Sequence, residues 1–72
     1  MKVFIGFRYR THKTPPHCYR EVTRIEERNG VTFATVETFH PNGMHPSSNM
    51  PLRVLEDYLS RPNIGLTTLT PY

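Results

Sequence analysis

An Asn29-Gly30 pair lies between two stretches rich in β-forming residues, and it constrains the fold more than any other feature of the chain. A two-residue type I′ turn needs positive φ at both central positions, which Asn and Gly adopt most readily. Residues 18–27 and 31–39 are therefore expected to form an antiparallel hairpin. The apolar side chains of 31–39 fall in both phases of the strand, which a β-bulge or burial of both faces would explain.

A second alternating pattern covers residues 2–9, where every second residue is apolar or aromatic: Val3, Ile5, Phe7 and Tyr9. Such alternation predicts a half-buried strand with a charged outer face. Pro15 and Pro16 follow within residues 10–17. They predict an exposed loop, because proline lacks the amide hydrogen that a strand would donate.

The C-terminal half predicts a loop followed by a helix. Three prolines and several turn-forming residues between positions 40 and 51 indicate the loop. Pro51 suits the first turn of a helix, and Ser48 or Asn49 is expected to cap it. Leucines at positions 52, 55 and 59 form an apolar helix face, and Arg61-Pro62 ends the helix. Residues 63–72 are expected to be either a short strand or a flexible tail that orders on a partner.

These elements predict an α+β fold, with a three- to four-stranded antiparallel sheet and one C-terminal helix packed on a face. At 72 residues the chain has room for one domain, expected over residues 1–62, with residues 63–72 as the terminal strand or tail. A single cysteine cannot form an internal disulfide, and no stretch has the pattern of a signal peptide or the length of a membrane span. The expected location is the cytoplasm.

Positive charge is concentrated at the N-terminal end of the chain. The first twenty residues hold five of the nine Lys and Arg residues and none of the six acidic ones. Cations interleaved with tyrosines suit an acidic protein surface, or the phosphates and bases of a nucleic acid. A basic edge strand that only prevents aggregation is the plainer interpretation, but five unopposed cations exceed that need. The predicted partner-binding face consists of Arg8, Arg10, His12, Lys13, His17 and Arg20.

Metal-binding and catalytic arrangements receive less support from the residues. A zinc ion could be surrounded by His17, Cys18, His40 and His45, yet structural zinc sites in small domains commonly use two or more cysteines at short spacing. Neighbours on a strand point to opposite faces, which argues against a His17–Cys18 thiol–imidazole pair. No phosphate-binding loop, serine-hydrolase motif or zinc-protease motif occurs. The expectation is a protein that is not an enzyme and needs no metal or cofactor.

The stretch RYRTHKTPPHCYREVTRIEERNGVTFATVETFHPNG, with the overall length and the basic N-terminal half, resembles small proteins of lytic Xanthomonas-type phages that bind the host RNA polymerase. The resemblance implies a phage regulator that attaches to the β and β′ subunits near the RNA exit channel. It implies inhibition of transcription initiation by displacement of sigma, and suppression of termination. It also implies the host bacterial cytoplasm as location, a Nus-type elongation factor as a further partner, and contact with nascent RNA.

The likeness contains no diagnostic motif, so the six residues of the predicted face come from surface reasoning alone. That reasoning leaves a second function open. A small basic module that binds RNA or single-stranded DNA would use the same cations and tyrosines.

Overall fold

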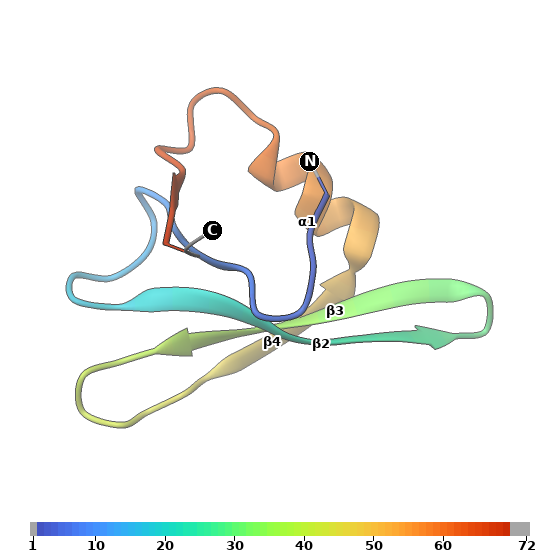
Figure 1. Cartoon of the computed structure of the whole chain (residues 1–72), viewed down its shortest axis with the longest axis horizontal. Helices are drawn as coiled ribbons and strands as arrows, with labels where there is room; N and C mark the ends of the chain where they lie inside the picture. The colour runs from blue at the N-terminus through green and yellow to red at the C-terminus, as the bar shows by residue number, and fades with distance from the viewer. Residues whose placement is uncertain (1, 70–72) are drawn as a thin grey trace.

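The computed structural model describes residues 2–69, which form an α+β fold of five strands and one helix (Figure 1). In chain order the elements are β1 (Arg8–Arg10), β2 (Tyr19–Arg28), β3 (Val31–Phe39), β4 (Ser47–Pro51), α1 (Leu52–Leu59) and β5 (Thr67–Thr68). The strands form a sheet in the order β4-β3-β2-β1-β5, and neighbouring strands are antiparallel. The predicted class, antiparallel sheet and packed helix are confirmed, whereas the described residues hold more strands than the three or four expected.

The β2–β3 hairpin forms as the sequence predicts. Asn29 and Gly30 have φ of 52° and 79°, so both central residues of the turn take the left-handed conformation. The register shifts between Val22 and Arg24, so a bulge lies in β2 and not in β3. The mixed phase of β3 arises because its aromatic residues lie on the face opposite to its buried aliphatic ones.

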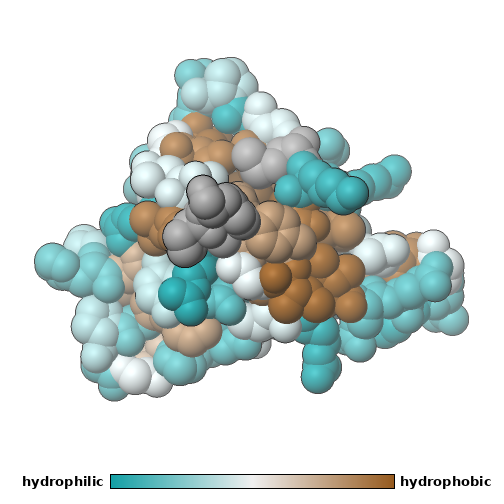
Figure 2. Space-filling model, in the orientation of Figure 1, coloured by the Kyte–Doolittle hydropathy of each residue, from teal (hydrophilic) through white to brown (hydrophobic). Residues whose placement is uncertain are grey.

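The strand predicted over residues 2–9 is wrong for most of its length, because β1 begins only at Arg8. Gly6 has a φ of 95°, and its amide donates to the carbonyl of Val22 at 2.8 Å, so the chain turns there and does not extend. The turn breaks the alternation: the other apolar residues of the pattern are buried, but Ile5 is 59% exposed. Figure 2 shows hydrophobic surface in several places on the viewed face, with the largest patch near its centre and hydrophilic side chains between them.

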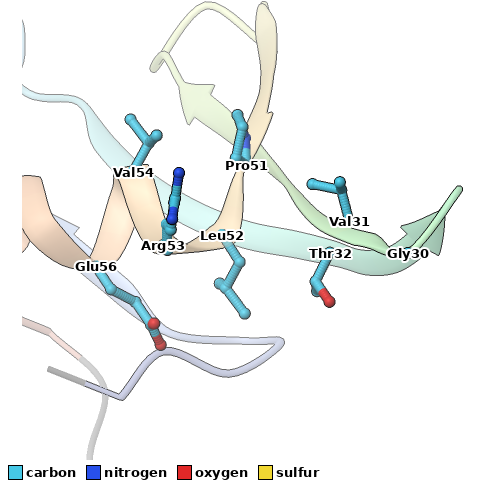
Figure 3. A pocket seen from close by; sticks show the side chains of 8 residues that line it. All are labelled: Gly30, Val31, Thr32, Pro51, Leu52, Arg53, Val54 and Glu56. Atoms are coloured by element: carbon cyan, nitrogen blue, oxygen red, sulfur yellow. The ribbon is translucent and has the colours of Figure 1, made fainter.

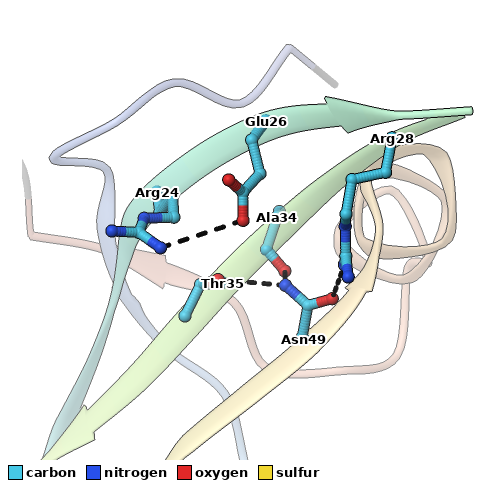
Figure 4. Close-up of polar contacts among 6 residues, drawn as sticks. All are labelled: Arg24, Glu26, Arg28, Ala34, Thr35 and Asn49. Carbon is cyan, nitrogen blue, oxygen red and sulfur yellow. Dashed lines mark hydrogen bonds and ion pairs between the residues drawn. The ribbon is translucent and has the colours of Figure 1, made fainter. Parts of the chain in front are cut away.

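Residues 40–51 were predicted as a loop, and that prediction is wrong for Ser47–Pro51, which form β4. Serine and asparagine are common turn residues, so the sequence conceals the strand. Asn49 anchors it: its amide nitrogen donates to Oγ1 of Thr35 at 3.0 Å, and its amide oxygen accepts from Arg28 at 2.6 Å (Figure 4). Pro51 is tolerated because it is the last residue of a strand that pairs only with β3 in the described part of the chain.

Helix α1 packs its apolar face on the sheet, as predicted. The predicted side-chain cap is wrong: Pro51 is the N-cap residue and makes no cap hydrogen bond, because the two expected caps, Ser48 and Asn49, belong to β4. The helix closes over a single hydrophobic cluster made of Val3, Phe7, Tyr9, Val22, Ala34, Val36, Leu55, Leu59 and Ile64.

The segment after the helix is part of the same packed unit as far as it is described. Ile64 is 5% exposed, and its carbonyl accepts from the amide of His12 at 2.8 Å. Thr67–Thr68 pair with β1 as strand β5, so these positions form the strand and not the tail. Residues 70–72 lie outside the described residues.

The two faces of the sheet have different surroundings. Figure 1 shows α1, the N-terminal segment and the chain that follows the helix on one side, here called the helix-side face. The opposite side, which no described element covers, is called the open face. Strand register assigns residues to them, because directly paired residues point the same way. Tyr9, Arg20 and Thr38 form one row on the helix-side face, whereas Arg8 and Glu21 pair on the open face.

Candidate binding cleft

The six residues predicted to form one partner-binding face lie in three different places. Two arginines of β1 project on the open face, and the arginine of β2 lies on the helix-side face beside Tyr9. The remaining three residues lie in the loop between β1 and β2. These three groups are Arg8 and Arg10; Arg20; and His12, Lys13 and His17.

The arginines of β1 already have partners within the chain. Nε of Arg8 donates to Oε1 of Glu21 at 2.7 Å, and its guanidinium lies 5.1 Å from the centre of the Tyr19 ring. The hydrogen bond to Glu21 raises the pKa of the Arg8 guanidinium, and Tyr19 contributes to the rise. Arg10 donates to the carbonyl of Cys18. Both side chains are therefore held within the chain, Arg8 by a carboxylate and Arg10 by a backbone carbonyl oxygen.

A row of aromatic rings crosses the same open face. The Tyr19 and Phe39 rings are stacked, with centres 5.0 Å apart and planes 10° apart, and the His45 ring lies 4.2 Å from Phe39. Arg8, on the strand on the other side of β2, lies against Tyr19. Single-stranded nucleic acids bind by stacking bases on open ring faces. Because these ring faces contact one another, the row leaves little stacking surface.

The open face also carries charges of both signs. Arg24 lies 3.9 Å from Glu26, and Arg28 donates to Asn49 while its guanidinium lies 4.3 Å from the centre of the Phe33 ring (Figure 4). Such a mixed, internally paired surface has a weak net field. It does not resemble the phosphate-binding stripe that a nucleic-acid-binding face needs.

The helix-side face contains a cleft of about 340 Å³, here called the Arg20–Arg61 cleft. It lies between α1 and the sheet, where the helix leaves part of that face uncovered. Its apolar lining is Tyr9, Val36, Met50, Val54 and Leu55. Its polar lining is Arg20, Thr38, Ser48, Tyr58 and Arg61.

Both arginines of the cleft lack a charged partner in the part of the chain that the structure describes. Nε of Arg20 is buried and has no hydrogen-bond partner among the described residues. A buried donor left unpaired costs about 1–3 kcal/mol, so such atoms are uncommon in folded proteins. Arg61 follows the helix and forms no ion pair within residues 2–69; its guanidinium lies 5.8 Å from the centre of the Tyr58 ring.

A second cavity, of about 360 Å³, adjoins the cleft and shares Tyr58 and Arg61 with it. Lys13 and His12 line its other side, and Nδ1 of His12 lies 2.8 Å from the carbonyl oxygen of Ile64. Among the described residues, no Asp or Glu lines either cavity. The two cavities are therefore neighbours, and no described carboxylate of their linings balances the positive charge.

Tyr9 forms part of the cleft wall and is 2% exposed. Burial raises the pKa of its phenol above the ordinary value of 10.0, because the phenolate would lose its hydration. The nearby Arg20 guanidinium acts in the opposite direction, and Tyr58 adds to the rise. Arg20 and Tyr58 are thus both close enough to Tyr9 to affect its ionisation, and Tyr9 is neutral at physiological pH.

Of the four residues considered as zinc ligands, the structure brings only Cys18 and His40 into contact. Sγ of Cys18 lies 3.2 Å from Nδ1 of His40 and 3.4 Å from the carbonyl oxygen of Pro16, while the His45 ring packs on Phe39. No group of three or more metal-ligating side chains occurs within residues 2–69. Cys18 is 3% exposed, so its thiol is enclosed by the fold.

A larger cavity, of about 540 Å³, lies between the β2–β3 turn and the start of α1 (Figure 3). Its lining includes Val31, Leu52 and Val54 together with Arg53 and Glu56. Oε2 of Glu56 accepts from the backbone amide of Val3 at 3.2 Å. The single cation and single carboxylate of this cavity balance one another, so it lacks the unbalanced charge of the Arg20–Arg61 cleft.

Sequence reasoning missed Tyr58 and Arg61 and assigned Arg20 to the wrong set of neighbours. For Arg20 a signal existed: it is two residues before the buried Val22, so strand periodicity places both on one face. For Arg61 no local signal existed. Its position beside Arg20 depends on how the helix crosses the sheet.

Comparison with protein-family models, curated proteins and solved structures finds no match to this chain. Within the described residues, no helix has the length and apolar character needed to cross a bilayer.

Proposed function

We propose that the protein is a non-enzymatic phage regulator that binds host bacterial RNA polymerase in the bacterial cytoplasm. It would attach to the β and β′ subunits near the RNA exit channel, inhibit initiation and suppress termination, with a Nus-type elongation factor as a further partner. The resemblance of residues 8–43 names this partner. The observation that carries the binding role is the unbalanced positive charge around the Arg20–Arg61 cleft.

The composition of this region suits a protein partner. Arginine and tyrosine are the residues most often responsible for binding energy at protein interfaces, especially where they border an apolar pocket. Arg20, Tyr58 and Arg61 surround such a pocket, floored by Val36 and Met50. An acidic surface on polymerase would complete the missing half of each ion pair.

A non-enzymatic role fits the geometry of the titratable groups. The thiol–imidazole contact in the described residues joins Cys18 to His40, and Cys18 is only 3% exposed. The cleft supplies cations and hydroxyl groups but no carboxylate or cysteine in its described lining. Those groups can bind an anion, and the imidazole of the adjoining cavity, that of His12, is held against the Ile64 carbonyl oxygen.

A direct RNA- or single-stranded-DNA-binding module is the second candidate, favoured by the two neighbouring cationic cavities, which share Tyr58 and Arg61. Phosphate binding would make the affinity fall steeply with salt. The contacts within the Tyr19–Phe39–His45 row weigh against it, because they remove the stacking surface that such modules use.

Affinity capture from a nuclease-treated bacterial lysate, read by mass spectrometry, tests the proposal. We expect recovery of the β and β′ subunits with sigma depleted. Arg61→Glu should reduce that recovery at least tenfold, since it reverses a charge at the interface. Arg24→Glu on the open face is the matched control, because its side chain is 67% exposed and lies away from the cleft.

Two outcomes would contradict this proposal. Loss of all polymerase after nuclease treatment would transfer the function to nucleic-acid binding. Capture of a different complex, with no β or β′ subunit present, would remove polymerase as the partner.

A further inference from the structure

We propose that the Arg20–Arg61 cleft is a recognition site for a carboxylate side chain that is flanked by an apolar residue on a partner polypeptide. The inference rests on the proposed protein-binding function and deepens it by naming the chemistry that the cleft takes. The carboxylate would lie between the two guanidinium groups, and the neighbouring apolar side chain would fill the floor of the cleft.

The first observation is the unsatisfied donor of Arg20. Its Nε is buried without a hydrogen-bond partner in residues 2–69, although the side chain lines an open cleft. A guanidinium presents Nε–H and one terminal N–H side by side, a spacing that matches the two oxygens of a carboxylate. A carboxylate that enters the cleft would therefore accept a hydrogen bond from Nε of Arg20 and also neutralise the guanidinium charge.

Arg61 supplies the second cation from a different element. It lies on the chain just after α1, and both it and Arg20 line the same cavity. No described acidic residue lines the cavity, so no carboxylate of its lining repels an incoming anion. Two arginines that line one cavity favour an anion more strongly than Arg8 of the open face, which Glu21 already neutralises.

The floor of the cleft indicates which side chain lies next to the carboxylate in the ligand. Val36, Met50 and Leu55 provide an apolar surface, and Thr38 and Ser48 add hydroxyl groups at its edge. A volume of about 340 Å³ is at the small end of ligand sites and holds a few side chains. A phosphodiester backbone would leave this apolar floor uncovered, whereas a glutamate next to a leucine or phenylalanine would cover it.

The direct test uses isotope-labelled protein and three synthetic probes at millimolar concentration. The first is a ten-residue peptide with a central glutamate flanked by leucines, the second has glutamine in place of the glutamate, and the third is an oligothymidylate. The nuclear magnetic resonance signals of the Arg20 Nε–H and of the Thr38 and Ser48 amides report binding. We expect shifts of these signals with the glutamate peptide and at least tenfold weaker binding of the glutamine peptide.

Variants of single arginines locate the binding. Arg20→Lys keeps the charge but removes the paired donors, and Arg61→Gln removes an exposed charge without disturbing the core. Each should weaken the glutamate peptide about tenfold, because one charge-assisted hydrogen bond is lost. Arg24→Gln, on the open face, removes the same charge and should leave the affinity unchanged.

The outcomes separate this inference from the proposed function. The inference is overturned if the glutamate peptide shifts none of the cleft signals, if the oligothymidylate shifts them and the peptide does not, or if Arg24→Gln weakens binding as much as Arg61→Gln. Peptide binding at the cleft with no capture of polymerase would support the inference and contradict the named partner. Capture of polymerase that is unchanged in Arg20→Lys and Arg61→Gln would keep the partner and overturn the cleft as its site.

Discussion

Arg8 and Arg20 lie on adjacent strands, yet one is fully partnered and the other is not. Arg8 on the open face contacts Glu21 and the Tyr19 ring. Arg20 on the helix-side face keeps a buried Nε–H without an acceptor in the described residues. Two cations that contribute equally to the net charge of the sequence thus differ in whether they keep an unpaired hydrogen-bond donor. The number of cations at one end of a chain therefore does not show which of them keep unpaired donors once the chain is folded.

The difference follows from which residues share a face. On the open face, register sets Arg8 opposite Glu21 and brings aromatic side chains from neighbouring strands into contact. On the helix-side face, the row through Arg20 contains Tyr9 and Thr38, neither of which carries a negative charge at neutral pH. The charged and aromatic side chains of the first surface are paired with one another, whereas the second keeps a buried arginine donor without a partner among the described residues.

The largest effect is expected where the cleft joins the core. Tyr9→Ala should lower the free energy of unfolding by about 3–5 kcal/mol, because a 2% exposed aromatic ring is replaced by a cavity. That loss is comparable with the whole net stability of roughly 3–5 kcal/mol expected for so small a core. Tyr19→Ala on the open face is the matched control and should leave a folded protein in urea titrations followed by circular dichroism. Equal losses of unfolding free energy in the two variants would contradict the assignment of Tyr9 to the core and of Tyr19 to the surface.

A smaller effect of the opposite sign is expected at Arg20. Arg20→Met should raise the free energy of unfolding by about 1–2 kcal/mol, because an apolar side chain of similar length removes an unpaired buried donor. The same change should abolish binding of the glutamate peptide. Urea unfolding and peptide titration of one preparation measure both. A destabilised Arg20→Met would show that the guanidinium already has a stabilising partner.

The aromatic row of the open face should contribute less. Phe39→Ala removes the ring between Tyr19 and His45, and we expect a loss of about 1 kcal/mol, the usual size for an aromatic pair. Peptide binding at the cleft should be unchanged. Weaker peptide binding in this variant, with folding intact, would place the partner on the open face.

The smallest effect concerns pH. Because the folded pKa of Tyr9 is raised above 10.0, the unfolded chain releases this proton first as the pH rises. Stability should therefore be independent of this group below its ordinary pKa and fall as the pH rises through the folded value. Tyr9→Phe, compared with the parent protein by urea unfolding between about pH 9 and pH 11, should remove this part of the decline. A steeper decline of stability with pH in the variant would contradict a raised pKa for Tyr9.

The sequence was sufficient for those parts of the fold that local chemistry determines. The Asn29-Gly30 turn, both strands of the hairpin and the leucine-rich helix follow from turn geometry and periodicity. Strand β4 was missed because tertiary pairing with β3 overrides the turn preference of its residues. The N-terminal strand was predicted too long because one glycine at positive φ interrupts an otherwise regular pattern.

For the candidate site, the sequence supplied Arg20, Lys13 and His12 but could not group them with Arg61. That grouping arises from long-range packing, in which the chain after α1 returns to the loop between β1 and β2 and Ile64 accepts hydrogen bonds from His12. It also could not show that Arg8 and Arg10 are engaged within the chain. Local patterns carry neither kind of information.

The short strand β1 has a consequence for how the protein is made. Tyr9 pairs with Arg20 on one side and with Thr68 on the other, so its position needs both ends of the described chain. During synthesis the β2–β3 hairpin can close from local contacts, whereas the Tyr9–Thr68 pairing must wait until residue 68 has left the ribosome. The strand that carries the Tyr9 wall of the cleft therefore gains its second neighbour only after the rest of the described sheet has been synthesised.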